Sequence, residues 1–340
     1  MLTIAYIGFG NSVIRYHLPY IRHRNHIKIK SVYRRKEDRD SDFERQREKL
    51  YPEIHFTDDL NELLMDNEID CIVINTPDAT HVHYAKIVLN AGKHVLVEKP
   101  FAPTEKQAKE VFDLATEKNL VCYVNHNRRY DADFLTLKKV LESGKLGDII
   151  EIESHYDYFK PYDSLKNGPR EKGWFIYSLG VHNFDQIVSH FGIPDDVRYD
   201  VRSFNEDGAE DYFDLQFFYE KLKVSISSSL YVMIDYPRFL VHGTKGSFTK
   251  QSQGHLSSVK TPEPIHTSFS VEDESKWGIL SYINDQGEHI TEKVPSEVTD
   301  YGRLYDDLHE IILLGKPKIV KDEQVLAVLS ILESAKKSLK

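Results

Sequence analysis

The sequence of 340 residues lacks the features of several protein classes. Its two cysteines, Cys71 and Cys122, lie within apolar runs, so we expect reduced, buried thiols and neither a disulfide scaffold nor a cysteine-based zinc site. No stretch approaches the roughly 18 uninterrupted apolar residues that a membrane-spanning helix requires. The formal net charge of -10 opposes non-specific binding of nucleic acid. These absences predict no membrane and no nucleic-acid partner, and they favour chemistry on a small molecule.

The N-terminus also lacks the features of a secretory signal. Residues 1–7 lead directly into a glycine-containing loop, without a basic segment or a small-residue cleavage site, so we expect a cytoplasmic protein. The composition, with 40% hydrophobic and 29% charged residues, is ordinary for a globular chain. Since a domain typically holds roughly 100 to 200 residues, two domains are expected.

Residues 1–124 show an alternation of strands and helices. Short runs rich in Val and Ile alternate with longer amphipathic segments, which is typical of β-α-β units around a parallel sheet. The expected strands are 3–7, 27–33, 54–56, 71–75, 94–97 and 120–124. Helices are expected over 81–89 and 103–117, and 41–49 is expected as an exposed helix or loop that carries little chemistry. Six strands match the doubly wound sheet of a Rossmann dinucleotide-binding domain.

The pattern changes after residue 124. A helix expected over 131–141 is followed by alternating apolar and polar runs, and helices return at 301–314 and 323–338. The alternating runs are 149–159, 212–219, 223–231 and 239–241. Turn sequences separate these runs, which is typical of antiparallel strands. This order predicts an α+β domain over 125–340 with a large, mainly antiparallel open sheet.

The segment Gly8-Phe9-Gly10-Asn11 lies between the first expected strand and a helix. Glycines at this position allow backbone N–H groups to approach a pyrophosphate at the helix N-terminus. The third glycine of the usual G-x-G-x-x-G fingerprint is Val13 here, and an ordinary strand-to-helix turn is the alternative interpretation. We predict that Gly8, Gly10 and Asn11 bind the phosphates of a dinucleotide.

Two arginines follow the second expected strand, where an NAD-specific site usually presents an acidic residue to the adenosine ribose. Arg34 and Arg35 would attract a 2'-phosphate, which a guanidinium binds in bidentate fashion, so they favour NADP(H). Glu37, Asp38 and Asp40 follow closely and could neutralise this basic turn. NAD(H) is therefore the alternative cofactor.

The sequence Glu98-Lys99-Pro100 closes an apolar strand. The carboxyl ends of these strands form the edge of the sheet where Rossmann ligands bind. A lysine at this edge could donate a proton to, or accept one from, a hydroxyl or carbonyl that exchanges a hydride. From these residues alone, a surface Glu-Lys pair that ends a strand is the alternative.

Four motifs occur together and in order along residues 8–130. They are Gly8-Phe9-Gly10, Asn75-Thr76-Pro77 with His81, Glu98-Lys99-Pro100 and Asn127-Arg128-Arg129-Tyr130. Together they resemble the Gfo/Idh/MocA oxidoreductases, the family of glucose-fructose oxidoreductase and inositol dehydrogenase. The likeness spans the whole chain, and the Glu-Lys-Pro element is its most specific part.

The resemblance implies roles for individual residues. Lys99 would stand near the nicotinamide and the substrate, with a cis peptide before Pro100, and Glu98 and Asn127 would help to position the cofactor. The same cleft would be lined by Thr76, Pro77 and His81. No metal site is expected, since histidines two positions apart on a helix, as at 81 and 83, do not converge on one ion.

The segment Gly180-Val181-His182-Asn183-Phe184-Asp185 resembles a second element of the family, which supplies an Asp and a His beside the reacting carbon. His182 matches the histidine and Asp185 the last acid, but Ser178 replaces the first Asp, so the usual partner of the imidazole on that side is missing. His182 is still suited to general acid or base chemistry near neutral pH. Tyr158, in an alternating aromatic segment, is a candidate substrate contact, with core or interface packing as the alternative.

These features predict an NAD(P)-dependent oxidoreductase. It would transfer a hydride between NADP(H), or alternatively NAD(H), and a hydroxyl or carbonyl carbon of a sugar or polyol-like molecule, with Lys99 and His182 handling the proton. The alternatives are a dinucleotide-binding sensor without turnover and a reductase of an imine or enamine. The resemblance also implies that the sheet of the second domain packs against another subunit, giving a homodimer or homotetramer.

Overall fold

The structure is a computed structural model that describes residues 1–161, 170–251 and 272–339, and these form two compact units. The first unit comprises residues 1–127 and 300–326, and the second comprises the other described residues. This division differs from the sequence-based boundary at 124 in one main respect. Residues 300–326 pack with the first unit, because helix α9 (Arg303–Leu314) brings the buried Tyr305 against Tyr6 and His17.

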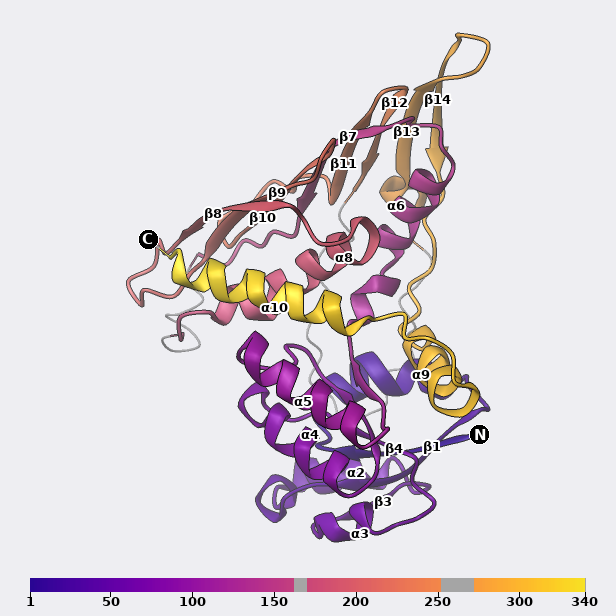
Figure 1. Ribbon diagram of the computed structural model, residues 1–340, viewed down its shortest axis with the longest axis vertical. Helices are drawn as coiled ribbons and strands as arrows, with labels where there is room; N and C mark the ends of the chain where they lie inside the picture. The colour runs from indigo at the N-terminus through magenta and orange to yellow at the C-terminus, as the bar shows by residue number, and fades with distance from the viewer. Residues whose placement is uncertain (162–169, 252–271, 340) are drawn as a thin grey trace. The chain divides into compact units, whose positions relative to one another are not determined.

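A parallel sheet of six strands forms the centre of the first unit (Figure 1). Its strands are β1 (Leu2–Ile7), β2 (Ile27–Tyr33), β3 (His55–Thr57), β4 (Cys71–Ile74), β5 (His94–Val97) and β6 (Cys122–Val124). They lie in the order β3-β2-β1-β4-β5-β6, and every neighbouring pair is parallel. The predicted Rossmann sheet is thus confirmed, and its strand order reverses between β1 and β4, where such sheets bind ligands.

Helices connect the strands of this sheet. They are the π-helical turn η1 (Val13–His17), α1 (Leu18–Ile21), the short turns η2 (Lys36–Arg39) and η3 (Asp78–Thr80), α2 (Asp42–Lys49), α3 (Leu60–Leu64), α4 (His81–Asn90) and α5 (Glu105–Glu117). The hydroxyl of Thr104 caps α5 by accepting a hydrogen bond from the backbone N–H of Gln107. This helix buries the apolar stripe that its sequence spacing predicts, which is Ala108, Val111, Phe112 and Ala115.

A sheet of eight strands forms the second unit (Figure 1). Its strands are β7 (Ile149–His155), β8 (Asp196–Arg202), β9 (Tyr212–Phe218), β10 (Lys223–Ser229), β11 (Phe239–Gly243), β12 (Gly246–Lys250), β13 (Gly278–Ile283) and β14 (His289–Val294). The order is β14-β13-β12-β11-β7-β10-β9-β8, and every neighbouring pair is antiparallel except β7 and β10. The predicted mainly antiparallel sheet is confirmed, although none of the runs expected from the sequence covers β8, β12, β13 or β14.

One face of the large sheet packs on helices. The helical parts of this unit are α6 (Ala132–Glu142), the π-helical turn η5 (Ile176–Gly180), α8 (Val181–Phe191), the short turn η6 (Glu274–Lys276) and most of α10 (Asp322–Lys337), and η4 (Asn127–Tyr130) leads into it. Phe184 of α8 lies with its ring centroid 5.7 Å from those of Phe213 and Phe217, which alternate with polar residues along β9. No helix among the described residues is both long and apolar enough to cross a membrane.

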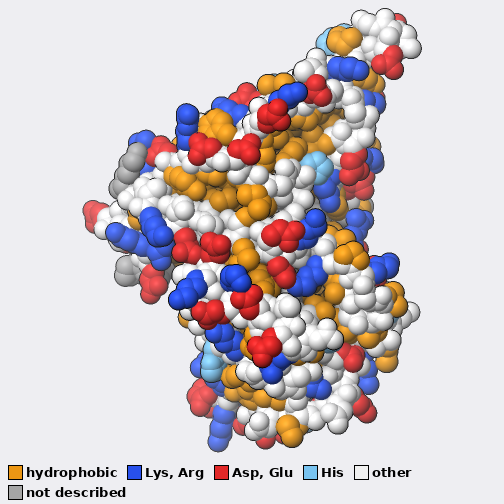
Figure 2. Space-filling view, in the orientation of Figure 1, with side chains coloured by type: hydrophobic (Ala, Val, Ile, Leu, Met, Phe, Trp, Pro, Cys, Tyr) orange, Lys and Arg blue, Asp and Glu red, His pale blue; other side chains and the backbone are white. Residues whose placement is uncertain are grey.

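Apolar side chains also reach the surface over the strands of the large sheet (Figure 2). The exposed isoleucines on its strands are Ile150, Ile279 and Ile283, each between 45% and 49% exposed. Strand β13 places Ile279 and Ile283 on one side, because side chains four residues apart on a strand share a face. This side of the sheet therefore combines polar residues with apolar ones.

Candidate dinucleotide site

The glycine loop after β1 passes unusually close to the chain that follows β4. Gly8 has a φ of 93°, and a Cβ atom added to it would lie 2.2 Å from the carbonyl oxygen of Asn75. Both the backbone conformation and the lack of space therefore require glycine at position 8. The contact holds the ends of β1 and β4 together at the point where the strand order reverses.

Gly10 differs from Gly8 in having open space beside it. A Cβ added to Gly10 would have no atom within 4 Å outside its chain neighbours, and its φ is not positive. The loop enters a helical segment at Asn11, so backbone N–H groups border this space. Open space next to a helix N-terminus is what a pyrophosphate needs, and the residues present here therefore fit a dinucleotide.

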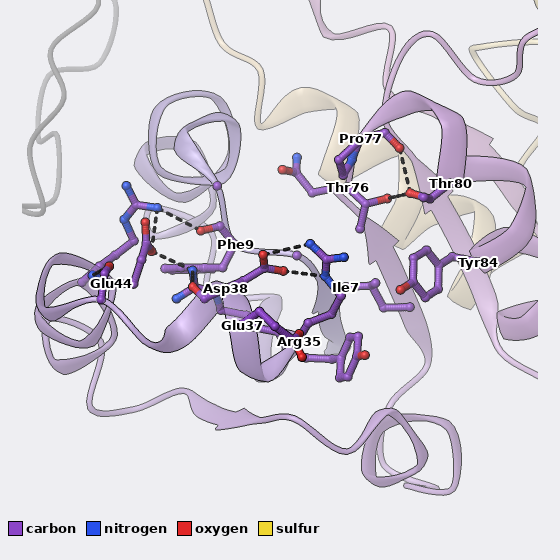
Figure 3. A pocket seen from close by; sticks show the side chains of 17 residues that line it. Ile7, Phe9, Arg35, Glu37, Asp38, Glu44, Thr76, Pro77, Thr80 and Tyr84 are labelled. Carbon is purple, nitrogen blue, oxygen red and sulfur yellow. Dashed lines mark hydrogen bonds and ion pairs between the residues drawn. The ribbon is translucent and has the colours of Figure 1, made fainter.

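A cavity of about 490 Å³ extends from the glycine loop along the ends of β1, β2 and β4 (Figure 3). It is lined by Ile7, Gly8, Phe9, Gly10, Tyr33, Arg34, Arg35, Glu37, Asp38, Ser41, Glu44, Arg47, Asn75, Thr76, Pro77, Thr80 and Tyr84. Six of the predicted cofactor residues are in this lining: Gly8, Gly10, Arg34, Arg35, Thr76 and Pro77. Tyr84, which α4 contributes to the lining, was not predicted.

Helix α2 supports the glycine loop, although its sequence had indicated an exposed segment with little chemistry. Arg47 of this helix is 4% exposed and donates hydrogen bonds to the carbonyl oxygen of Phe9 and to Oδ1 of Asn11. The side chain of Asn11 is therefore held by Arg47. Burial lowers the pKa of Arg47 from its ordinary value, against the opposing effect of the Glu44 carboxylate. The highly charged helix α2 thus contributes one buried cation, Arg47, next to the glycine loop.

Arg34 lies at the end of β2 but is held within the protein. Its side chain is 6% exposed, and its two terminal nitrogens donate to the carboxylates of Glu44 and Glu48 at 2.7 and 2.9 Å. One of these nitrogens also donates to the backbone carbonyl of Asp38 at 2.6 Å. Because both ends of its guanidinium fork bind carboxylates, Arg34 orders the turn after β2.

Arg35 is the more accessible of the two arginines, with a side chain 61% exposed. Its Nε and Nη2 donate to the two carboxylate oxygens of Asp38 at 2.8 and 2.9 Å. Figure 3 shows the two side chains pointing toward one another within the lining. The hydrogen bond from Arg35 holds the pKa of Asp38 below its ordinary value. A carboxylate therefore occupies the guanidinium fork that a 2'-phosphate would use.

His81 joins two turns at the carboxyl edge of the sheet. Its imidazole is fully buried, with Nδ1 2.8 Å from the carbonyl oxygen of Pro100 and Nε2 2.9 Å from that of Thr76. The hydroxyl of Thr80 donates to the carbonyl of Pro77 at 2.7 Å. His81 thus fixes the turns that follow β4 and β5 and does not itself line the cavity.

Glu98 and Lys99 stand where β5 ends, next to β4 in the sheet. Glu98 is 9% exposed, and its Oε1 accepts hydrogen bonds from Nε2 of His17, at 2.7 Å, and from the amide of Asn125. Burial by itself raises the pKa of Glu98, but the hydrogen bond from His17, with the charge of Lys99 and the hydrogen bond from Asn125, lowers it below its ordinary value. Lys99 is partly exposed and precedes Pro100 through a cis peptide bond.

The remaining residue predicted to bind cofactor is Asn127. It is 9% exposed and begins the turn η4, at the end of the first unit. His17 and Asn125 were not predicted. Both carry polar side chains close to glycine-loop or strand-end motifs, and the structure shows that the Glu98 carboxylate brings them together. A buried acidic residue at a strand end, which must find donors, was the signal that could have led to them.

In the second unit, the predicted residues His182 and Asp185 lie on α8. His182 is 6% exposed. Asp185 is 2% exposed and accepts two hydrogen bonds from the guanidinium of Arg129, at 2.8 and 2.6 Å. Its carboxylate thus holds Arg129. Ser178, which replaces the acid of the related family, donates its hydroxyl proton to the backbone carbonyl of Phe175 at 3.2 Å.

Tyr158 follows the end of β7, which is shorter than the expected strand 149–159. The backbone N–H of Tyr158 still bonds to the carbonyl of Ser229 at 2.8 Å, so the chain continues along β10 without a regular ladder. The ammonium of Lys160 lies 4.6 Å from the centre of the Tyr158 ring. Among the described residues, no group of three or more His, Cys, Asp or Glu side chains could hold a metal ion.

In a comparison with known proteins, both parts of the chain match domains of one protein family. Residues 2–126 match the NAD-binding Rossmann fold, and residues 138–340 the C-terminal alpha/beta domain, of the Gfo/Idh/MocA oxidoreductase family. The chain is 45% identical over 337 residues to an uncharacterized oxidoreductase of Escherichia coli K12, YhhX, which covers 98% of this chain and 95% of that protein.

Two further relatives match this chain over nearly its full length. A solved structure of an oxidoreductase from Bacillus cereus is 39% identical, with a TM-score of 0.86 and coverage of 98% of this chain and 95% of that one. IolW of Bacillus subtilis 168, a scyllo-inositol 2-dehydrogenase (NADP(+)), is 29% identical over 345 residues, covering 100% of this chain and 94% of that protein. The likeness therefore includes both units.

The two glycines of the loop give the first prediction. Gly8→Ala is expected to lower the free energy of unfolding by at least about 2 kcal/mol, because its Cβ would collide with Asn75. Gly10→Ala is expected to change stability by less than about 1 kcal/mol but to weaken NADPH binding at least tenfold, because its Cβ would enter the open space. Chemical denaturation and calorimetric titration measure the two effects. Equal losses of stability would contradict this account of the loop.

Proposed function

The chain belongs to the Gfo/Idh/MocA family of oxidoreductases, and from this premise we propose that it transfers a hydride between NADP(H) and the hydroxyl or carbonyl carbon of a sugar or polyol-like molecule. The observation that carries the proposal is the placement of Lys99 at the carboxyl end of β5, the strand next to β4, on the same edge of the sheet as the glycine loop that follows β1. A bound nicotinamide cofactor would supply the hydride chemistry. The protein would supply binding, orientation and proton transfer.

Binding of the dinucleotide is assigned to the first unit. The N–H groups that follow Gly8 would hold the pyrophosphate, and the Thr76-Pro77 turn, fixed by His81, would border the cofactor on the β4 side. Glu98 and Asn127 are proposed to position the nicotinamide end. The cavity beside the glycine loop fits the adenosine end, since it extends along the end of β2.

Arg35 is the proposed ligand of the 2'-phosphate. Arg34 is committed to Glu44 and Glu48 within the protein, whereas the pair of Arg35 with Asp38 is exposed and therefore weak enough to open. The name of the relative IolW includes NADP(+), which agrees with this choice. NAD(H) is the second candidate, favoured by Asp38 itself, because a carboxylate there could accept hydrogen bonds from an unphosphorylated ribose.

Lys99 is proposed to exchange the proton with the substrate oxygen. Its ammonium would donate when a carbonyl is reduced and its amine would accept when a hydroxyl is oxidised, while its positive charge stabilises the developing oxyanion. His182 is proposed as a second group for this proton. Asp185, held by Arg129, is proposed to order α8 near His182, and Tyr158 to contact the substrate.

Cofactor choice gives the second prediction. Arg35→Ala is expected to weaken NADPH binding about tenfold and to leave NADH binding within about twofold, because only NADPH carries the 2'-phosphate. Asp38→Ala is expected to strengthen NADPH binding, since it frees the guanidinium of Arg35. Arg45→Ala is the matched control, because Arg45 forms a similar exposed pair with Asp42 outside the cavity lining. If Asp38→Ala weakens NADH binding and leaves NADPH binding unchanged, the cofactor is NAD(H).

Lys99 gives the third prediction. Lys99→Met is expected to lower kcat at least 100-fold and to leave the Kd for NADPH within about threefold, because the ammonium handles a proton and the loop holds the cofactor. Lys86→Met, which removes an exposed lysine paired with Glu110 on the neighbouring helix, is the control and should retain activity. Steady-state kinetics on a panel of polyols and sugars, with calorimetry for the cofactor, make the measurement.

The replacement of an acid by Ser178 favours one rival from another class, a dinucleotide-binding sensor without turnover. Such a protein would bind NADPH yet reduce or oxidise nothing in a panel that also includes imines and enamines. Turnover of imines alone would assign the reductase alternative instead. Loss of activity in Lys99→Met on a polyol or sugar would exclude both rivals.

We also propose that the large sheet joins subunits into a homodimer or homotetramer, on the strength of its exposed isoleucines. Ile279→Glu together with Ile283→Glu is expected to lower the mass measured by sedimentation, because two charges would enter an apolar contact. Leu314→Glu, at a 62% exposed apolar position in the first unit, is the control and should not change it. An unchanged mass in the double variant would place any subunit contact elsewhere.

A further inference from the structure

Three buried side chains extend behind Glu98 into the core of the first unit. They are His17, from the π-helical turn η1, Tyr305, from α9, and Tyr6, from β1. The three residues are, in this order, 0%, 1% and 0% exposed. Figure 1 shows α9 beside the N-terminal strand. Tyr305, which lies between the other two side chains, therefore comes from a segment near the C-terminal end of the sequence. Polar groups buried this deeply must satisfy one another.

The contacts run in one line from Tyr6 to Glu98. The hydroxyl oxygens of Tyr6 and Tyr305 are 2.7 Å apart, and the Tyr305 hydroxyl is 2.6 Å from Nδ1 of His17. On the other side of the imidazole, Nε2 is 2.7 Å from Oε1 of Glu98. Oε2 of the same carboxylate accepts a hydrogen bond from the backbone N–H of Lys99 at 3.2 Å. The line therefore ends on the backbone of the residue assigned to proton transfer.

The direction of these hydrogen bonds follows from the number of protons available. An ionised carboxylate only accepts, so His17 donates to Glu98 from Nε2. When the imidazole is neutral, Nδ1 accepts from the hydroxyl of Tyr305, and that hydroxyl, which has a single proton, accepts in turn from Tyr6. When the imidazole is protonated, Nδ1 donates to the Tyr305 hydroxyl, and the same three side chains remain linked. Burial raises the pKa of both phenols, which keeps them protonated for this purpose.

The π-helical turn accounts for the position of His17. In this turn the backbone N–H of Leu18 bonds to the carbonyl of Val13, five residues earlier, instead of four as in an α-helix. The wider turn takes up one extra residue directly after the glycine loop. Val13, which stands in the place of the third glycine, begins this turn and is fully buried. The departure from the glycine fingerprint and the inward histidine are thus parts of one local structure.

We propose that Tyr6, Tyr305 and His17 form a positioning chain that fixes the orientation of the Glu98 carboxylate and, through it, the backbone of Lys99. The proposal rests on the function proposed above for Lys99. None of the three side chains needs to touch substrate or cofactor. The groups that face Glu98 are His17 from η1, Asn125 after β6 and the adjacent Lys99 after β5, with Tyr6 and Tyr305 beyond the imidazole.

The first test measures Glu98 directly, in cofactor-free protein and without turnover. Carbon-13 NMR follows the titration of the glutamate carboxyl groups, and the signal of Glu98 is the one that Glu98→Gln removes. His17→Asn cannot reach Glu98, so we expect the pKa of Glu98 to rise by about one unit as the donor to its charged form is lost. His17→Gln places an amide nitrogen near the position of Nε2 and should reverse most of this rise. Tyr305→Phe should produce a smaller rise.

The second test measures catalysis. His17→Asn and Tyr305→Phe are expected to lower kcat about tenfold, with KM and the Kd for NADPH within about twofold, because the orientation of Lys99 affects the chemical step more than binding. Tyr123→Phe is the matched control. Tyr123 is also a buried tyrosine of the first unit, and its hydroxyl holds the 300–326 segment by accepting a hydrogen bond from the backbone N–H of Val320. It should retain wild-type kcat.

The two tests separate this proposal from the proposed function. Titration of Glu98 at the wild-type pH in both His17→Asn and Tyr305→Phe would overturn the positioning chain, whatever the activity. A raised pKa with wild-type kcat would overturn it as well, because Lys99 would then be independent of Glu98. A wild-type protein without turnover would overturn the proposed function alone, since the NMR titration still decides whether the chain holds Glu98. Thermal unfolding confirms that the compared variants are folded.

Discussion

The buried carboxylate of Glu98 is the constraint on which the first unit depends. A charge that is 9% exposed is stable only when donors surround it, and here the donors come from η1, from the residues after β6 and from the backbone of Lys99. Satisfying this one side chain therefore fixes the end of β5 relative to the start of the first helix. The close approach of Gly8 to Asn75 fixes the neighbouring strands β1 and β4. Together the two contacts define the edge of the sheet at which the candidate site lies.

The sequence predicted the first unit well because its signals are local. Runs of Val and Ile named all six strands, and the glycine loop and the Glu98-Lys99 pair fell at strand ends where the structure has them. The partners of these residues could not be predicted, because each arises from packing between distant segments. Arg34 illustrates the limit: an arginine after β2 suggests phosphate binding, and only the fold shows two glutamates of α2 holding it inside. Tyr305 likewise lies far from His17 in sequence.

The second unit was predicted in type but not in detail. Alternation along β9 and β10 indicated antiparallel strands. In contrast, β13 buries only Gly278 and Leu280 and β14 buries no residue, so these two strands gave little signal. Asp185 was expected beside the substrate because the segment 180–185 resembles the family element that supplies an Asp and a His there. The structure shows that Arg129 is its buried partner, a pairing between residues 56 positions apart that no local pattern reveals. A single sequence therefore gives little indication of which charged side chains will be buried, because their partners lie far away along the chain.

The position of Tyr305 late in the chain has a consequence for how the protein is made. The ribosome synthesises the residues of β1 to β6 long before those of α9, so the Rossmann unit stays incomplete while all of the second unit except its C-terminal part is synthesised. During that interval His17 and Tyr6 face an interior from which Tyr305 is absent. The part of the protein that is encoded first is thus among the last to mature. For the same reason, a fragment cut after residue 127 would carry every phosphate-binding glycine and still lack a piece of its own core.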